Sequence, residues 1–332
     1  MKAGSTALVR VAVATLWDRP ERVRPIDAPA LTPAADVRRW VAGLVPDQQI
    51  GENVLSQLLL GEQVLVEEVR ADGWASVVAI EQPAAKLDPR GYPGWLPSDQ
   101  LVDESVAADH AGERVVVDAT ATALRDSPDG DVALPGVIIG TSLTAAGPGY
   151  RGWRPVWVPG HERPLWAVAR DLAPVLERPP AAEEVLAVAA RLLDVAYVWG
   201  GVSVYGIDCS GLVHLAWRRF GVRLPRDADD QAAATTPLVL GDELPGDLYF
   251  FARPDKPIHH VGFVVAPSDR SSGRRLLHAS YTRRRVVDEP VAGERAATLV
   301  GTHRVPVTAG PARASAPGTY SAGSPPLRSP AS

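Results

Sequence analysis

The spacing of hydrophobic residues changes along the chain, and each change predicts a different kind of element. In residues 8–16 apolar and polar positions alternate, which is typical of a strand with one buried face. Residues 34–46 and 50–60 carry apolar positions at helical spacing and predict two short helices. The period then returns to two, so we expect a β-rich first unit with a helical insertion over residues 1–108.

A similar order of short strands and turns follows in the next part of the chain. Residues 114–120 have a strand pattern, residues 127–130 form a turn signal, and Gly152-Trp153 repeats the earlier Gly73-Trp74 step. Short strands separated by turns and Gly-Trp steps of this kind are typical of small antiparallel barrels. We therefore predict a second β-barrel over residues 109–176, similar to the first.

The C-terminal part changes character after the Arg178-Pro179-Pro180 linker. Alanine-rich residues 181–193 predict a helix, and two further helices are expected from Asp208 and over 227–234. Five strand-like segments come next: 247–252, 259–266, 274–280, 284–290 and 298–307. Helices followed by an antiparallel run of strands are typical of an α+β fold, predicted here for 177–308. Residues 309–332 are rich in Pro, Ala, Gly and Ser, and we expect them to be disordered.

The composition of the chain limits the cellular location and the binding partners that we expect for this protein. The formal net charge of −5 gives little attraction for nucleic acid or an anionic membrane. One cysteine in 332 residues excludes an internal disulfide, and the N-terminus has no sustained apolar run. We expect neither a signal peptide nor a membrane span, and a cytoplasmic location.

The single cysteine, Cys209, falls where a glycine-rich loop becomes a helix. Asp208 is a natural N-cap, which places Cys209 in the first turn. There the helix dipole favours negative charge, so we expect a lowered thiol pKa and a nucleophilic thiolate. A lone cysteine is more often a small buried hydrophobe. The polar neighbours Asp208 and Ser210 favour the nucleophile.

A thiol nucleophile needs a base, and seven histidines are available. His259 and His260 are adjacent on a predicted strand and therefore point to opposite faces. His214 lies ~140° around its helix from Cys209 and faces away from it. The other histidines outside the predicted site (His110, His161 and His303) are expected to have structural or surface roles. A metal site is not predicted, because neither HExxH nor paired CxxC spacing occurs.

Four motifs resemble those of the NlpC-type papain-like cysteine peptidases: YVWGG (197–201), DCSGL (208–212), PGDLYFF (245–251) and HVGF (260–263). The resemblance implies a papain-like catalytic domain with Cys209 as nucleophile, His260 as general base and His278 orienting that base. It also places the Tyr197 hydroxyl near the thiol, where it could stabilise the oxyanion. In one branch of the family, two bacterial Src-homology-3-like domains precede the catalytic domain, similar to the two barrels predicted here.

That branch implies a cofactor-free endopeptidase for the γ-D-glutamyl–diamino acid bond of recycled murein peptides with a free N-terminal L-alanine. An ammonium requires acceptors, and Asp208 and Ser210 beside the nucleophile are the predicted contacts, with Tyr92 contributed by the first barrel. The family also expects an acidic residue from this barrel, for which Glu52 and Glu62 are both open. Arg226 and Asp227 are assigned structural roles, an ion pair and a helix cap.

Three other functions stay open on the sequence alone. One is a broader secreted peptidoglycan hydrolase whose barrels bind the cell wall. Another is a catalytically inert murein-binding module. The third is an acyltransferase on the same scaffold, because water and an amine compete for the same thioester. In each case the predicted partner is a murein peptide, and the oligomeric state is left open.

Overall fold

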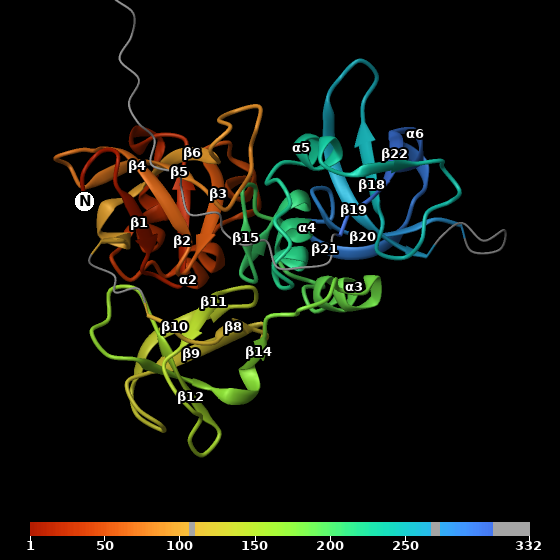
Figure 1. The fold of residues 1–332 in the computed structure, drawn as a ribbon. Coiled ribbons are helices and arrows are strands. Elements are labelled where there is room, and N and C mark those ends of the chain that lie inside the picture. Colours follow the sequence, from red (N-terminus) through yellow and green to blue (C-terminus); the bar gives the residue numbers. More distant parts are fainter. Residues whose placement is uncertain (106–109, 267–272, 308–332) are drawn as a thin grey trace, which may run out of the picture.

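The computed structural model describes residues 1–105, 110–266 and 273–307. It consists of two seven-stranded antiparallel sheets, a six-stranded sheet with helices, and a two-stranded hairpin (Figure 1). The mixture of helices and antiparallel strands predicted for the chain is confirmed. The tail predicted from residue 309 lies outside the described residues, and the domain boundaries stay a prediction. No helix in the described ranges combines the length and apolar character that a membrane crossing requires.

The first sheet is formed by the N-terminal residues. Its strands are β1 (Thr6–Val9), β2 (Val13–Trp17), β3 (Val54–Leu59), β4 (Gln63–Val69), β5 (Trp74–Ala79), β6 (Tyr92–Pro97) and β7 (Leu101–Asp103), in the order β3-β2-β6-β5-β4-β1-β7. A segment with α1 (Ala28–Leu31), α2 (Val37–Gly43) and three 3-10 turns (Pro20–Arg22, Pro25–Asp27 and Pro46–Ile50) separates β2 from β3. The rings of Trp17 and Trp40 meet edge to face at 5.7 Å and join this segment to the sheet.

Two predictions in this unit were wrong. Residues 50–60 form strand β3 and not a helix, because Leu16 and Leu58 lie on paired strands and their side chains enter the sheet core. The apolar spacing in this segment fits a helix as well as a strand, and pairing with β2 decides in favour of the strand. The strand predicted over 8–16 is two strands, since the chain turns between Val9 and Val13 and pairs with different neighbours. The helix predicted over 34–46 is present as α2.

The second sheet repeats the first strand for strand. Its strands are β8 (Arg114–Val117), β9 (Ala121–Arg125), β10 (Val132–Ile138), β11 (Ser142–Ala145), β12 (Trp153–Trp157), β13 (Leu165–Val168) and β14 (Leu172–Pro174). Their order, β10-β9-β13-β12-β11-β8-β14, is that of the first sheet with each number raised by seven. The internal repeat predicted from the sequence is therefore confirmed. Closure into barrels is not, because in the described part of the chain no pairing joins the terminal strands of either sheet.

The C-terminal unit packs helices on a third sheet. The helices are α3 (Ala182–Ala190), α4 (Cys209–Arg218), α5 (Ala228–Ala233) and α6 (Gly293–Ala297), and β15 (Val202–Ser203) pairs with β16 (Gly206–Ile207). The sheet has the order β17 (Thr236–Leu238), β22 (Leu299–Arg304), β18 (Leu248–Ala252), β19 (Ile258–Ala266), β20 (Arg275–Ser280) and β21 (Arg285–Pro290). Helix α4 lies against β19 and β20 and is covered in turn by α3 (Figure 1).

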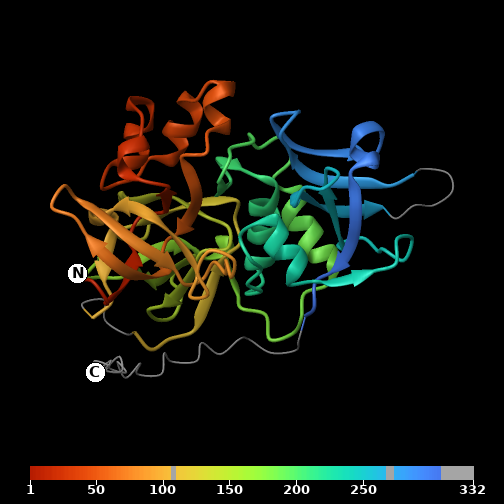
Figure 2. The ribbon, with the colours of Figure 1, turned by 90° about the horizontal axis from the view of Figure 1, so that it is seen from above.

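Both N-terminal sheets hold the far end of α4 through ion pairs. Arg218 lies 3.1 Å from Glu62, in the turn between β3 and β4 of the first sheet, and Arg219 lies 2.6 Å from Asp118, which follows β8 of the second. The helical segment and the third sheet flank the chain that leads into α4 (Figure 2). There the N–H of Trp199 donates to the Gln49 carbonyl at 2.8 Å. The start of α4 is thus fixed against the first unit as well as against its own sheet.

Candidate active site

Cys209 is the first residue of α4, and Asp208 caps the helix as predicted. One oxygen of the Asp208 carboxylate accepts from the Gly211 N–H at 2.7 Å, and the other accepts from the Gly200 N–H at 2.9 Å. Gly200 has a φ of +75°, and a Cβ there would lie 2.6 Å from the Val54 carbonyl oxygen. A glycine is therefore required where the loop passes strand β3. Cys209 is 7% exposed and lines a cavity together with Asp208 and Ser210.

The thiol is not stabilised as a thiolate in the free protein. Burial, followed by the charge of Asp208, raises the pKa of Cys209 to about 12, although the N–H groups of Val261 and Ser210 act in the opposite direction. The expectation of a pKa lowered by the helix terminus was wrong, because removal from water outweighs the dipole at this site. The Cys209 thiol is therefore neutral at neutral pH, and a nucleophilic role would require a neighbouring base to take its proton.

Two histidines and a carboxylate form a chain of hydrogen bonds across three neighbouring strands. Nε2 of His260, on β19, lies 2.7 Å from Nδ1 of His278, on β20. Nε2 of His278 lies 3.1 Å from Oε1 of Glu289, on β21. A Cβ at Gly262 would come within 2.8 Å of the His278 Cβ, so glycine allows β20 to approach with its histidine. The structure thus brings together the two histidines that the family resemblance selected.

The direction of this chain assigns the tautomers. The Glu289 carboxylate can only accept, so Nε2–H of His278 donates to it, and its Nδ1 is left to accept from Nε2–H of His260. Nδ1 of His260 then carries a free lone pair. Burial lowers the pKa of His278 to about 4 and holds the pKa of His260 well below its usual range. His260 is therefore a neutral base at neutral pH.

Cys209 and His260 line two adjoining parts of one cleft. The N–H of Val261, directly after His260, is close enough to Cys209 to lower the pKa of its thiol. Cys209 lines a cavity of about 410 Å³, and His260 lines an adjoining cavity of about 650 Å³. The side chains of Tyr197, Trp199 and His259 line both cavities. They therefore mark the point where the two cavities meet.

Arg226 pairs with the capping carboxylate of Asp208 and is only 1% exposed. Its Nη2 lies 2.7 Å and its Nη1 3.0 Å from the two carboxylate oxygens, and Nη1 also donates to the Ser210 hydroxyl at 3.0 Å. Its Nε donates to Ser56 of β3 at 2.9 Å. The predicted structural ion pair is present, but it is buried and connects the nucleophile loop to the first sheet.

The first sheet and the residues that follow its strands form one wall of the cavity beside Cys209. Four of its residues line that cavity: Glu52, Leu55, Lys86 and Tyr92. The Tyr92 hydroxyl donates to Asp227 at 3.3 Å, and Lys86 lies 3.3 Å from the same carboxylate. Of the two acidic residues left open by the sequence, Glu52 lies in the cavity, while Glu62 is buried against Arg218.

The chain is similar in sequence and in fold to known proteins. The NlpC/P60 family pattern matches residues 194–302. The chain is 34% identical to a γ-D-glutamyl-L-lysine dipeptidyl-peptidase of Bacillus subtilis, over 82% of this chain and 88% of the relative. It is 28% identical to the protein of the same name in Bacillus cereus, over 86% of each chain.

The fold agrees with the sequence comparison. The crystal structure of an NlpC/P60 family protein from Bacillus cereus superposes with a TM-score of 0.79 at 26% identity, covering 91% of this chain and 99% of that one. The chain belongs to the NlpC/P60 family. It is a cysteine peptidase.

The four histidines predicted to lie outside the site, His110, His161, His214 and His303, do not line either cavity of this NlpC/P60 peptidase. Nδ1 of His214 bonds the Leu224 carbonyl at 2.8 Å inside the core. His110 stacks on Trp157 at 3.5 Å, and His303 pairs with the Thr235 hydroxyl at 3.0 Å. Their predicted structural roles agree with these contacts.

Sequence reasoning missed Glu289 and Trp199 as parts of the peptidase cleft. Glu289 carries no motif, and only the pairing of β21 with β20 brings its carboxylate to His278. The sequence did place Glu289 on a predicted strand, residues 284–290. Its register against β20, which decides the contact, is a tertiary property.

One acidic group in the described residues is compact enough to share a cation, namely Asp227, Asp229 and Asp230. Lys86 already lies 2.6 Å from Asp229 and 3.3 Å from Asp227. Asp227 and Asp229 are therefore paired with an internal cation, Lys86, which lines the same cavity.

Proposed function

We propose that this peptidase hydrolyses the γ-D-glutamyl–diamino acid bond of small murein-derived peptides that carry a free N-terminal L-alanine. The two Bacillus relatives bear the name γ-D-glutamyl-L-lysine dipeptidyl-peptidase, which points to this bond. The observation that carries the proposal is the cavity beside Cys209, walled by Glu52, Lys86 and Tyr92 of the first unit. Such a wall leaves room for a short N-terminal segment and opposes a longer one.

The reaction begins with proton transfer from the Cys209 thiol to Nδ1 of His260 as the sulfur attacks the carbonyl carbon. The developing oxyanion accepts from the N–H of Cys209 and the Tyr197 hydroxyl. Burial, with the charge of a Cys209 thiolate, raises the pKa of Tyr197, so this hydroxyl keeps its proton as a donor. His260 then returns the proton to the leaving amine, and the C–N bond breaks to give a thioester.

Hydrolysis of the thioester completes the cycle. Water gives one proton to His260 and attacks the thioester carbonyl, and the sulfur leaves as the histidine returns that proton to it. His278 keeps Nε2–H of His260 engaged throughout, and Glu289 stabilises the pair when His260 becomes positively charged. When His260 takes up the proton, its positive charge is therefore stabilised through His278 by the carboxylate of Glu289.

Recognition of the N-terminal ammonium is assigned to the acidic cavity. Asp208 and Ser210 lie next to the nucleophile, but Arg226 already pairs with both oxygens of Asp208. The additional negative charge is supplied by Glu52, Asp227 and Asp229, which line the same cavity. The Tyr92 hydroxyl provides a further polar contact at this end.

The two repeated sheets are assigned to the Src-homology-3-like type on their shared topology. The first restricts the length of the substrate and the second supports α4 through Arg219 and Asp118. A peptidase restricted to short peptides fits the recycling of murein fragments in the cytoplasm, and we assign the chain to that role.

The decisive experiment compares L-Ala-γ-D-Glu-diaminopimelate with its N-acetylated form, using Cys209→Ala as the inactive control. We expect cleavage of the free peptide with a kcat/KM at least about 100-fold above that of the blocked peptide, since a buried charge pair is lost. Equal cleavage of both would overturn the role of the ammonium. Activity retained in Cys209→Ala would overturn the mechanism.

A further inference from the structure

The two cavities that meet at the cysteine and the histidine carry opposite charge. The cavity with Cys209 contains the carboxylates of Glu52, Asp208, Asp227 and Asp229, and its only lining cation is Lys86 among the described residues. The cavity with His260 is lined by three guanidinium groups, those of Arg253, Arg283 and Arg295, and by two carboxylates. A peptide lying across both cavities therefore meets a negative end and a positive end.

The reaction mechanism determines which part of the peptide lies in which of the two cavities. The histidine that protonates the leaving amine must lie on the leaving-group side of the scissile bond. His260 lines the basic cavity, and Cys209 lines the acidic one. The acyl part with its ammonium thus occupies the acidic cavity, and the departing diamino acid enters the basic cavity.

Two of the three arginines have no carboxylate partner among the described residues. Arg253 is exposed and Arg295 partly buried, and neither makes an ion pair there. The guanidinium of Arg295 lies 5.4 Å above the Phe251 ring. By contrast, Arg283 pairs with Glu289 at 3.2 Å. Free guanidinium groups beside a leaving-group site favour carboxylates and oppose an ammonium.

Arg295 is an arginine of this cavity whose charge acts on both Cys209 and His260. Burial lowers the pKa of its guanidinium, while Glu289 and a Cys209 thiolate act in the opposite direction. The thiol of Cys209 is therefore within electrostatic reach of Arg295. A substrate carboxylate bound to Arg295 would lie in the same part of the cleft.

We infer that the basic cavity selects a leaving diamino acid with a second carboxylate, of the diaminopimelate type, over lysine, with Arg295 and Arg253 as the specificity-determining residues. Both amino acids share the α-carboxylate, but the lysine side chain ends in an ammonium alone. The end of the diaminopimelate side chain carries a carboxylate beside its ammonium. This inference rests on the proposed function, since it names the diamino acid that the same site takes.

The test compares L-Ala-γ-D-Glu-meso-diaminopimelate with L-Ala-γ-D-Glu-L-lysine on the full chain. We expect the diaminopimelyl peptide to have a kcat/KM about tenfold higher or more, as one charge-assisted pair gained in a partly buried site allows. In Arg295→Gln this ratio is expected to fall to near one. Arg253→Gln should reduce it in the same direction.

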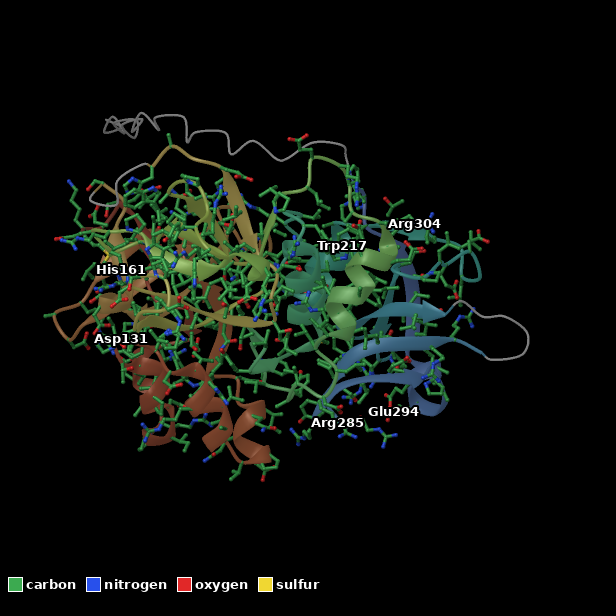
Figure 3. The ribbon with its side chains drawn as sticks, turned by 90° about the horizontal axis from the view of Figure 1, so that it is seen from below. Asp131, His161, Trp217, Arg285, Glu294 and Arg304 are labelled. Carbon is green, nitrogen blue, oxygen red and sulfur yellow. The ribbon has the colours of Figure 1, made fainter. Side chains whose placement is uncertain are left out.

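Arg163→Gln is the matched control, because Arg163 is an exposed arginine in the loop between β12 and β13. Its neighbour in sequence, His161, is well separated from Glu294 of the basic cavity in Figure 3. This variant should keep the wild-type ratio. An equal loss for both peptides in Arg295→Gln, or equal cleavage of both by the wild type, would overturn the inference.

Binding separates this inference from the proposed function. Both peptides are titrated calorimetrically into Cys209→Ala, and the same titration is repeated with Cys209→Ala/Arg295→Gln. Tighter binding of the diaminopimelyl peptide that depends on Arg295 supports the inference even if neither peptide is hydrolysed by the wild type, a result that would reject the proposed function alone. Equal binding of the two peptides, with both cleaved, rejects the inference alone.

Discussion

The Arg226 guanidinium contacts both oxygens of the carboxylate of Asp208, the residue directly before Cys209, at 2.7 and 3.0 Å. The same guanidinium bonds Ser56, whose hydroxyl donates to Gln82 at 2.6 Å. Gln82 in turn donates to Glu62 at 3.2 Å, and Glu62 pairs with Arg218 at the far end of α4. A buried polar path therefore joins both ends of the nucleophile helix to the first sheet.

Removing the charge of Arg226 should destabilise the protein and the site together. In Arg226→Met the Asp208 carboxylate stays buried without its cation, and we expect a loss of about 3–5 kcal/mol in the free energy of unfolding. Denaturant unfolding measures the loss. Arg223→Met is the control, because Arg223 is 46% exposed and should change stability little. A loss in Arg226→Met no larger than in the control would show that the pair is dispensable.

Glu289 should matter for turnover through His278. In Glu289→Ala the acceptor for Nε2–H of His278 is lost, so the tautomer and orientation of the relay are no longer fixed, and we expect kcat to fall about 10- to 100-fold. Steady-state kinetics on the free tripeptide measures this fall. Asp288→Ala removes the adjacent carboxylate, which pairs with Arg275 instead, and should leave kcat nearly unchanged. Matching losses in the two variants would exclude a specific role for Glu289.

The reactivity of the thiol should follow pH in a defined way. Since burial raises the pKa of Cys209 to about 12, the thiolate fraction is small at neutral pH and grows about tenfold per pH unit. We expect the rate of iodoacetamide alkylation to increase throughout pH 6–10 without a plateau. N-acetylcysteine, whose thiol is unperturbed, should level off above pH ~9. A plateau for the protein near pH 7 would instead indicate a preformed thiolate–imidazolium pair.

The acid limb of the pH profile should reflect His260. Its pKa is held well below the ordinary value by burial, so the base stays neutral and competent as the pH falls through 6.5. Activity should be lost only at lower pH, when His260 is protonated in the folded protein. The measurement is kcat/KM against pH for the free tripeptide. An apparent pKa at or above 6.5 on the acid side would contradict this assignment.

Gly262 should tolerate no side chain. A Cβ at this position would clash with Leu276 and lie 2.8 Å from the His278 Cβ, which forces β19 and β20 apart. We expect Gly262→Ala to cost about 1–3 kcal/mol in the free energy of unfolding and to reduce kcat by displacing His278. Thermal unfolding measures the loss of stability, and steady-state kinetics measures the fall in kcat. A variant with normal stability and normal kcat would show that the strands can adjust.

The sequence by itself determined the local features of this protein. The capped helix with Cys209 in its first turn, the internal repeat, and five of the six strands of the C-terminal sheet follow from spacing and capping signals carried by neighbouring residues. The reading failed at residues 50–60, where apolar spacing fits a helix as well as a strand. There the pairing of β3 with β2 decided the element.

Only the tertiary structure decided the electrostatics of the site. Burial raises the pKa of Cys209, although the helix terminus favours the thiolate. The register of β21 brings Glu289 to His278. Folding also places acidic side chains in one cavity and basic side chains in the adjoining one. These properties depend on water exclusion and on distances between residues far apart in the chain. Local sequence does not specify either, because both arise when the separate elements pack together.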